Sequence, residues 1–277
     1  MVQGQQGITV QDIAEGVRVC LGPGGLSNSL VVEGHDTVLV VDTQLTPSLG
    51  RRVKDVASES GKPIKYVLLT HGDSDHVFGT QEFWPVSVVL SHRLTRDRIG
   101  KEGNTPIERA IQQRPHLKAE MEAVRIVVPE VGFEGDLEID LGGLIVKCLY
   151  MGPAHTPGDV AVWIAEKRVL HTADLVFNGI FPVMRMADVN GWLRSLDKLE
   201  RLDPAVVVPG HGSVGDSSVL EDQRRLLIAV RDRVKAAKSS GLSVDQAVSQ
   251  IRFPEYEQLP MAAARIPEAI KHLYSAI

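Results

Sequence analysis

The sequence predicts a single α/β domain over residues 1–277, with a helical C-terminal segment from about residue 216. The first observation is that short apolar runs typical of strands alternate with amphipathic helical stretches, and that the order strands, helix, strands, helix occurs twice. The second is size, because 277 residues with 43% apolar content can bury one full core. We therefore expect two similar halves.

The first half is expected to begin with an antiparallel meander, because its apolar runs are separated by turns rich in glycine or aspartate. Three strands are predicted, at 17–22, 27–34 and 37–44. Thr46 then suits a helix N-cap, Pro47 suits the first helical position, and Gly61 would end the helix. Further elements of this half are strands at 64–70 and 86–92 and a helix at 105–124 that Pro115 interrupts.

The second half repeats this outline and then becomes helical. Strands are predicted at 133–152, 159–166, 167–177 and 205–212, with a helix at 190–202 before the last of them. The stretch at 219–241 has a clear amphipathic helical pattern. Helices are therefore expected to dominate after Gly212.

Composition narrows the classes of partner and the compartment. Cys20 and Cys148 are too far apart in sequence for a thiolate metal motif and fit a reducing compartment. The first sixteen residues, MVQGQQGITVQDIAEG, lack the pattern of an export signal, and no long apolar run occurs, so we expect a cytoplasmic protein without membrane contact. A net charge of −5 with interspersed signs argues against nucleic acid and favours a small-molecule substrate. The oligomeric state has no signature in the sequence.

The stretch LLTHGDSDHVFG, residues 68–79, concentrates two histidines and two aspartates between His71 and His76. Such crowding costs stability through desolvation and like-charge repulsion unless a cation compensates. Three further residues follow apolar runs in the same way, namely His155, Asp174 and His211. Imidazole and carboxylate are ligands of zinc, iron and manganese, so the pattern indicates a metal site built at strand ends.

The motifs THGDSDH, AHTPGD, ADL and PGHG, in this order, resemble those of the metallo-β-lactamase-fold superfamily of metallohydrolases. The likeness covers about residues 17 to 213, and VVDTQ at 40–44 is similar to an early strand motif of that family, with Gln44 in place of glycine. The resemblance implies a four-layer αββα sandwich with a dinuclear metal site at one edge of two sheets.

The resemblance also implies the roles of individual residues. The first ion would be held by His71, Asp73 and His155, and the second by Asp75, His76 and His211, with Asp174 bridging. Three residues are expected to support the ligands, in the way that carboxylates and other acceptors fix metal-binding imidazoles: Thr70, Asp159 and Asp42.

Asp73 stands where the family motif has a histidine. The resemblance implies two divalent ions, with zinc as the first choice. The carboxylate of Asp73 adds negative charge and a harder ligand, which makes iron or manganese alternatives. Replacing Asp73 by histidine should raise zinc occupancy. The flavodiiron reductases of the superfamily are similar in having a carboxylate here, so a non-haem di-iron oxidoreductase without its own flavin domain is an alternative function. A non-catalytic binding module is another.

The preferred function is hydrolysis of a small ester, lactone, thioester or related substrate by a metal-activated water. Asp75 would orient the water and pass a proton to the leaving group. The segment after Asp174 is rich in apolar side chains, and Phe177, Phe181 and Met184 could form a wall for the substrate. Core packing is the competing interpretation of the same three residues.

Overall fold

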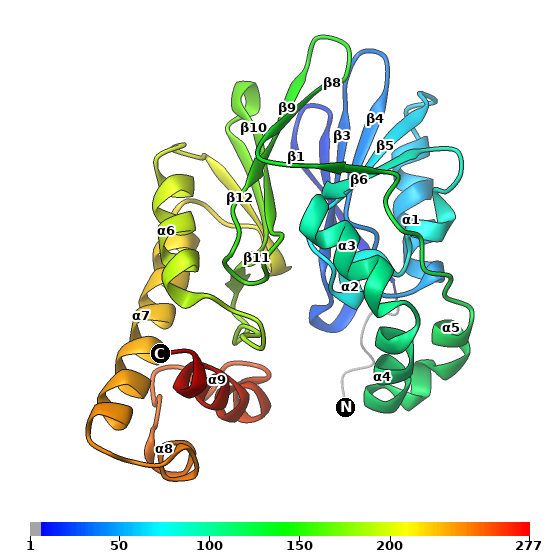
Figure 1. Ribbon diagram of the computed structural model, residues 1–277. Coiled ribbons are helices and arrows are strands. Elements are labelled where there is room, and N and C mark those ends of the chain that lie inside the picture. The colour runs from blue at the N-terminus through cyan, green and yellow to red at the C-terminus, as the bar shows by residue number, and fades with distance from the viewer. Residues whose placement is uncertain (1–6) are drawn as a thin grey trace.

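Two β-sheets lie face to face at the centre of the computed structural model, and helices cover their outer faces (Figure 1). The structure describes residues 7–277. Residues 1–6, which begin the stretch judged to lack an export signal, lie outside the described residues. Within 7–277, no helix combines the length and the apolar character needed to cross a bilayer. The predicted four-layer αββα sandwich is confirmed.

The first sheet has seven strands in chain order. They are β1 (Thr9–Ala14), β2 (Val17–Leu21), β3 (Asn28–Glu33), β4 (Val38–Val41), β5 (Ile64–Leu69), β6 (Val88–His92) and β7 (Val131–Phe133). The strands β2, β3 and β4 pair antiparallel, as the predicted meander requires, and β4 to β7 pair in parallel. The sequence analysis did not assign β1, because this edge strand is largely exposed and has no continuous apolar run.

The second sheet has five strands in the order β12, β11, β10, β9, β8. Their bounds are β8 (Leu137–Asp140), β9 (Ile145–Tyr150), β10 (Val160–Ile164), β11 (Val169–Asn178) and β12 (Val206–Gly212). The pairs from β8 to β11 are antiparallel, whereas β11 and β12 are parallel. The carboxyl ends of β9, β11 and β12 therefore meet at one edge of this sheet.

Helices form the two outer layers. Beside the first sheet are α1 (Pro47–Ser58), α2 (Ser74–Val77), α3 (Arg93–Glu102), α4 (Thr105–Gln113) and α5 (Lys118–Glu122). Beside the second are α6 (Val189–Glu200), α7 (Ser218–Ser239), α8 (Val244–Gln250) and α9 (Ala262–Ala276). As predicted, Thr46 caps α1 by accepting a hydrogen bond from Leu49 N at 3.2 Å, and Pro47 occupies the first turn.

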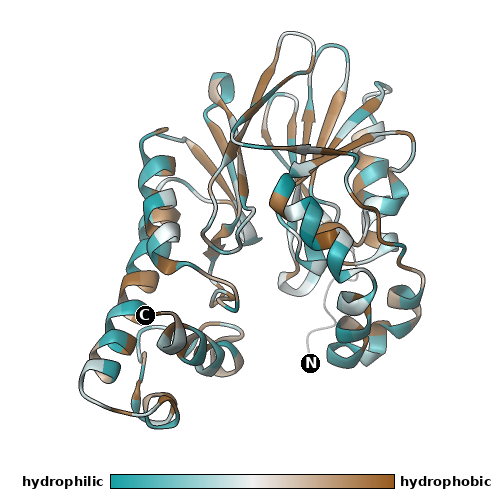
Figure 2. Cartoon of the chain, viewed as in Figure 1, coloured by the Kyte–Doolittle hydropathy of each residue, from teal (hydrophilic) through white to brown (hydrophobic). Residues whose placement is uncertain are grey.

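Three apolar clusters separate the layers. One lies between the two sheets and includes Val19, Leu68 and Val162. A second joins the first sheet to α1 and α4, and a third joins the second sheet to α6, α7 and α9. Figure 2 shows apolar residues along the strands of both sheets and polar stretches on the helices. This packing holds the two sheet edges in a fixed relation, which is what a site built from both of them requires.

Candidate metal centre

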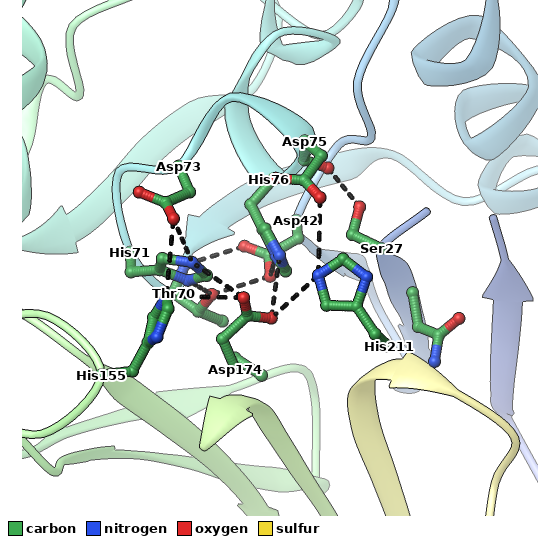
Figure 3. Close-up of polar contacts among 12 residues, drawn as sticks. Ser27, Asp42, Thr70, His71, Asp73, Asp75, His76, His155, Asp174 and His211 are labelled. Carbon is green, nitrogen blue, oxygen red and sulfur yellow. Dashed lines mark hydrogen bonds and ion pairs between the residues drawn. The ribbon is translucent and has the colours of Figure 1, made fainter. Parts of the chain in front are cut away.

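Four histidines and three aspartates from separate parts of the chain meet at one edge of the two sheets (Figure 3). They form two groups whose ligand atoms lie within 4.8 Å of one another. The first contains His71, Asp73, His155 and Asp174, and the second contains Asp75, His76 and His211. All seven residues that the sequence analysis assigned to metal binding are thus brought together, and their role as ligands is taken up as a proposal below.

The first group has the spacing of a metal site. His155 Nε2 lies 3.5 Å from Asp73 Oδ2 and 3.5 Å from Asp174 Oδ2, and His71 Nε2 lies 4.0 Å and 3.7 Å from the same two atoms. Ligand atoms at about 2.1 Å from a tetrahedral zinc ion lie roughly 3.4 Å apart. The carboxylate of Asp73 therefore reaches the first group although aspartate is shorter than histidine.

Asp174 lies between the two groups. Its Oδ1 is 3.1 Å from His76 Nε2 and 3.3 Å from His211 Nε2, while its Oδ2 faces the first group. His211 Nε2 is also 3.4 Å from Asp75 Oδ2. One carboxylate thus presents one oxygen to each group, which is the geometry that a bridging ligand needs.

Every imidazole of the centre is oriented by its Nδ1 atom. The Nδ1–H of His76 donates to Asp42 Oδ2 at 2.7 Å. The Thr70 hydroxyl also donates to Asp42 Oδ2, at 2.7 Å. Because the Thr70 proton is used in this way, Thr70 Oγ1 accepts the Nδ1–H of His71 at 3.0 Å. His155 donates to the Val183 carbonyl at 3.1 Å. His211 donates to the Gly25 carbonyl at 2.9 Å.

These Nδ1 contacts leave each Nε2 lone pair directed into the centre. Among the described residues, Nε2 of His71, His76 and His155 and Oδ1 of Asp174 are buried without a hydrogen-bond partner. Such a set of unpartnered buried atoms is costly unless something else binds them. An imidazole whose other nitrogen is held by an acceptor is the arrangement found in metal sites. The residues therefore fit divalent metal ions.

Backbone strain and a strand irregularity aim two of these carboxylates. Asp42 has a φ of 59° and Ala173 a φ of 47°, which non-glycine residues rarely adopt. The pairing of β11 with β12 shifts register on both sides of Ala173. The sequence analysis predicted strands at 167–177 and 205–212 that include Asp174 and His211, and β11 and β12 do continue through both residues. The irregularity at Ala173 turns Asp174 toward the centre from within its strand.

The centre is strongly polarised without an ion. Burial works to lower the pKa of His155, but the neighbouring carboxylates of Asp73 and Asp174 outweigh it and raise that pKa to about 9. Burial and the positive charge of His76 lower the pKa of His71 to about 4. Burial opposes ionisation of Asp174, yet the charges of His211 and His76 hold its pKa well below the usual range. Positive charge is therefore needed in the centre for its carboxylates to be stable.

Arg98 forms an ion pair with Asp73 that the sequence analysis did not anticipate. Arg98 Nη2 lies 2.8 Å from Asp73 Oδ1, and Arg98 Nε donates to Glu102 at 2.9 Å. From the sequence, Arg98 is expected on a solvated helix face, or as one of several basic residues that attract an anionic substrate, and neither interpretation pairs it with Asp73. The pair neutralises the charge that Asp73 adds, and it leaves Asp73 Oδ2 facing His71 and His155.

The other expected site residues take different positions. Asp42 and Thr70 support His76 and His71, as described above. Asp159 accepts hydrogen bonds from Thr156 N at 2.7 Å and Thr156 Oγ1 at 2.6 Å, so it braces the loop that carries His155 without touching the imidazole. Burial raises the pKa of Asp159 to about 6.

The three apolar residues expected to line a substrate site all lie in the core cluster beneath α6 and α7. Phe181 and Met184 are almost fully buried there, which favours packing. The Phe177 ring, in contrast, stacks on the His211 ring with centroids 5.0 Å apart and approaches His155 at 6.0 Å. Of the three residues, Phe177 is therefore the one whose position next to the centre is compatible with substrate contact.

Comparison with known protein families gives one match over most of the chain. The sequence model described as the Metallo-beta-lactamase superfamily matches residues 22–211. The match includes all seven residues of the centre and ends before α7, α8 and α9.

Two curated relatives are distant in sequence and longer than this chain. The chain is 26% identical over 195 residues to the 2,4-dinitroanisole O-demethylase subunit alpha of Nocardioides sp. (strain JS1661), which is 68% of this chain and 53% of that protein. It is 23% identical over 264 residues to the linear primary-alkylsulfatase of Pseudomonas sp. (strain ATCC 19151), which is 82% of this chain and 50% of that protein. The chain thus spans about half the length of these curated relatives.

Solved structures share the fold. The sec-alkylsulfatase Pisa1 from Pseudomonas sp. superposes with a TM-score of 0.79 at 15% identity, covering 97% of this chain and 50% of that one. A metallo-beta-lactamase from Pontibacter korlensis superposes with a TM-score of 0.66 at 20% identity, covering 79% of this chain and 98% of that one. At these identities the likeness shows the sandwich architecture.

Proposed function

This chain belongs to the metallo-β-lactamase superfamily, and on that premise we propose that it is a metal-dependent hydrolase of a small ester, lactone, thioester or related substrate. One observation carries the proposal. Four imidazoles have their Nδ1 atoms held by acceptors and their Nε2 atoms directed at two neighbouring points, with Asp174 between them. Relatives in the superfamily include enzymes named as an alkylsulfatase and β-lactamases.

Two divalent ions, with zinc as the first choice, would be held by the residues already described. His71, Asp73 and His155 would hold the first, and Asp75, His76 and His211 would hold the second, with Asp174 bridging. When bound, such ions supply Lewis acidity toward a carbonyl or related centre and lower the pKa of water. The Arg98–Asp73 pair supports zinc over harder ions, because it offsets the extra carboxylate charge.

Asp75 is the candidate for proton transfer. Its Oδ2 lies beside His211 Nε2, its side chain is about one fifth exposed, and the Ser27 hydroxyl donates to its backbone carbonyl. A carboxylate in this position can accept a hydrogen bond from the attacking water and then give the proton to the leaving group. Asp42 and Thr70 keep His76 and His71 in the tautomer that leaves Nε2 free.

The chain's thiols do not supply a nucleophile. Burial raises the pKa of Cys20 and of Cys148 to about 12, so both stay protonated and inert near neutral pH. Neither lies among the residues of the centre. A water nucleophile is consistent with this arrangement.

Metal analysis with turnover tests the proposal. Protein purified without added metal should contain up to two equivalents of zinc per chain and should hydrolyse at least one generic ester, lactone or thioester. His76→Ala and Asp174→Ala should each lower kcat/KM by at least a hundredfold with an unchanged circular dichroism spectrum, because each removes a ligand. His116→Ala is the matched control, since His116 is exposed.

Two outcomes would contradict the hydrolase. Two equivalents of iron, with visible absorbance that bleaches on reduction, would favour the di-iron oxidoreductase. A protein that takes up no metal under any loading condition would favour the binding module. Turnover retained in His76→Ala or Asp174→Ala would remove that residue from the mechanism.

A further inference from the structure

Arg265, in the first turn of α9, carries a partly buried guanidinium that forms no ion pair with any carboxylate of residues 7–277. Its Nη1 donates to the Phe181 carbonyl at 2.6 Å, and its guanidinium carbon lies 5.9 Å from the centre of the Phe177 ring. These contacts hold the side chain in place but use few of its five N–H donors. A partly buried cation with free donors and no ion-pair partner is unusual.

The Phe177 contact places Arg265 next to the metal centre. The same Phe177 ring stacks on His211 with an interplanar angle of 4°. Burial, with the positive charges of Arg185 and Arg114, lowers the pKa of Arg265, while the negative charges of Asp174 and Asp75 partly offset the lowering. Arg265 therefore shares its surroundings with two carboxylates of the centre and with two more arginines.

The three arginines come from three separate segments. Arg114 directly follows α4, Arg185 lies between β11 and α6, and Arg265 lies in the first turn of α9. Figure 1 shows α4 and α9 on opposite sides of the same end of the sandwich, below α2 and β11. Within the described residues, Arg114 and Arg185 have no ion pair and no side-chain hydrogen bond. Uncompensated like charges repel one another, and an anion bound among them would relieve the repulsion.

We propose that Arg265 binds an oxyanion group of the substrate beside the metal centre, and that Arg185 and Arg114 attract this group to the entrance. The substrate class is then an ester, lactone or thioester that also carries a carboxylate, sulfate or phosphate. This inference rests on the proposed hydrolase function. A planar guanidinium suits all three oxyanions, because two parallel N–H groups match two oxygens.

The chain offers a close structural control for Arg265. Arg233 on α7 also lies over a phenylalanine ring, Phe253, at 4.9 Å, and it donates to a backbone carbonyl at 3.1 Å. It differs in having a carboxylate partner, Glu255, at 2.6 Å. Substituting Arg233 therefore reproduces the loss of ring and carbonyl contacts without removing an unpaired cation.

Anion binding tests the inference without turnover. Zinc-loaded wild type, Arg265→Met and Arg233→Met are titrated by calorimetry with sodium sulfate, sodium phosphate and sodium acetate. For at least one anion, the dissociation constant should rise about tenfold or more in Arg265→Met and stay within about twofold in Arg233→Met. The order of affinity identifies the oxyanion. Equal dissociation constants in all three proteins, for every anion, would overturn the inference.

A second variant covers the case in which Arg265→Met does not fold. Arg185 is exposed, so Arg185→Gln should fold normally. It should weaken binding of the same anion about two- to threefold at low salt, with the difference vanishing at high salt, because a rim charge acts through screened attraction. An Arg185→Gln protein with wild-type affinity at low salt would count against the inference.

Kinetics with a matched pair of esters gives an independent readout. 4-Nitrophenyl acetate is neutral, and 4-nitrophenyl hydrogen glutarate carries a carboxylate. In Arg265→Met, the ratio of kcat/KM for the anionic ester to that for the neutral ester should fall about tenfold, mainly through KM, and Arg265→Lys should restore part of it. Equal losses for both esters would indicate a structural role. If wild type hydrolyses neither these esters nor any generic lactone or thioester, the hydrolase proposal fails, and the titration still decides the anion site.

Discussion

Asp73 and Arg98 form a partly buried ion pair at the edge of the first ligand group. Burial disfavours the charge of Asp73, but the neighbouring His155, His71 and Arg98 hold its pKa well below the usual range. The sequence analysis treated Asp73 as an added negative charge. The structure shows that Arg98, on α3, compensates the negative charge of Asp73.

We predict that the effect of Asp73→His depends on Arg98. In the single variant, Arg98 loses its carboxylate partner and faces an imidazole. Its Nη1 is already buried and has no partner among residues 7–277. The free energy of unfolding should therefore fall by about 1 to 3 kcal/mol. The double variant Asp73→His/Arg98→Met removes the stranded charge and should show higher zinc occupancy than wild type. Urea unfolding and elemental analysis measure the two effects.

The matching control is Arg98→Met alone, which should lower zinc affinity because Asp73 loses the group that fixes Oδ2 toward His71 and His155. A double variant with no more zinc than wild type would show that the carboxylate is the better ligand at this position, and our account of the substitution would then be wrong.

The parallel pair β11 and β12 positions the bridging carboxylate through a close backbone approach. A Cβ on Gly210 would lie 2.1 Å from Asp174 Oδ1 and 2.6 Å from the Ala173 carbonyl carbon. Only glycine therefore permits β12 to pass Asp174 at this distance. The need for glycine at position 210 arises from the packing of β12 against β11, two strands that α6 separates in the sequence.

We predict that Gly210→Ala displaces Asp174 and weakens zinc binding at least tenfold, because Asp174 faces both ligand groups. Competition with a chromophoric chelator measures the affinity. Gly100→Ala is the control, since a Cβ there would meet Val128 at an ordinary 3.8 Å. Unchanged zinc affinity in Gly210→Ala would mean that Asp174 does not bridge.

The two sheets and their helices bury the charged groups of the metal centre, so the free energy of unfolding of the whole molecule should depend on both metal and pH. Without an ion, the pKa of His155 stands at about 9, above its ordinary value of 6.5. A raised pKa stabilises the folded state fully below 6.5, and the contribution is lost as pH rises through about 9. Asp73 and Asp174 have lowered pKa values, so their contribution is constant in this range and is lost only in acid.

We therefore predict opposite pH trends with and without zinc. The chelator-treated protein should lose on the order of 2 kcal/mol of unfolding free energy between pH 6.5 and pH 9. Excess zinc should stabilise more at pH 9 than at pH 6.5, because protons no longer compete for the Nε2 atoms. Urea titrations at both pH values, with His155→Gln for comparison, measure this. A chelated protein whose stability rises with pH would refute the charge arrangement.

Much of the fold could be predicted because its signals are local. Thr46 and Pro47 mark the start of α1, and the apolar runs before His71 and His155 mark strands whose ends carry ligands. The strand β1 was missed because an exposed edge strand needs no apolar run. The strand predicted at 167–177 already includes Asp174, but the irregularity at Ala173 was not predicted, because a positive φ at an alanine has no residue signature.

The sequence by itself determined which imidazoles and carboxylates could form a metal centre, because residue type, order along the chain and position at predicted strand ends can all be read from the linear sequence. The tertiary structure alone decided what surrounds them. The carbonyls of Gly25 and Val183 orient two imidazoles, and backbone carbonyls look alike everywhere in a sequence. Arg98 and Arg265 are ordinary surface charges until packing buries them beside the centre, where one gains a carboxylate and the other has none.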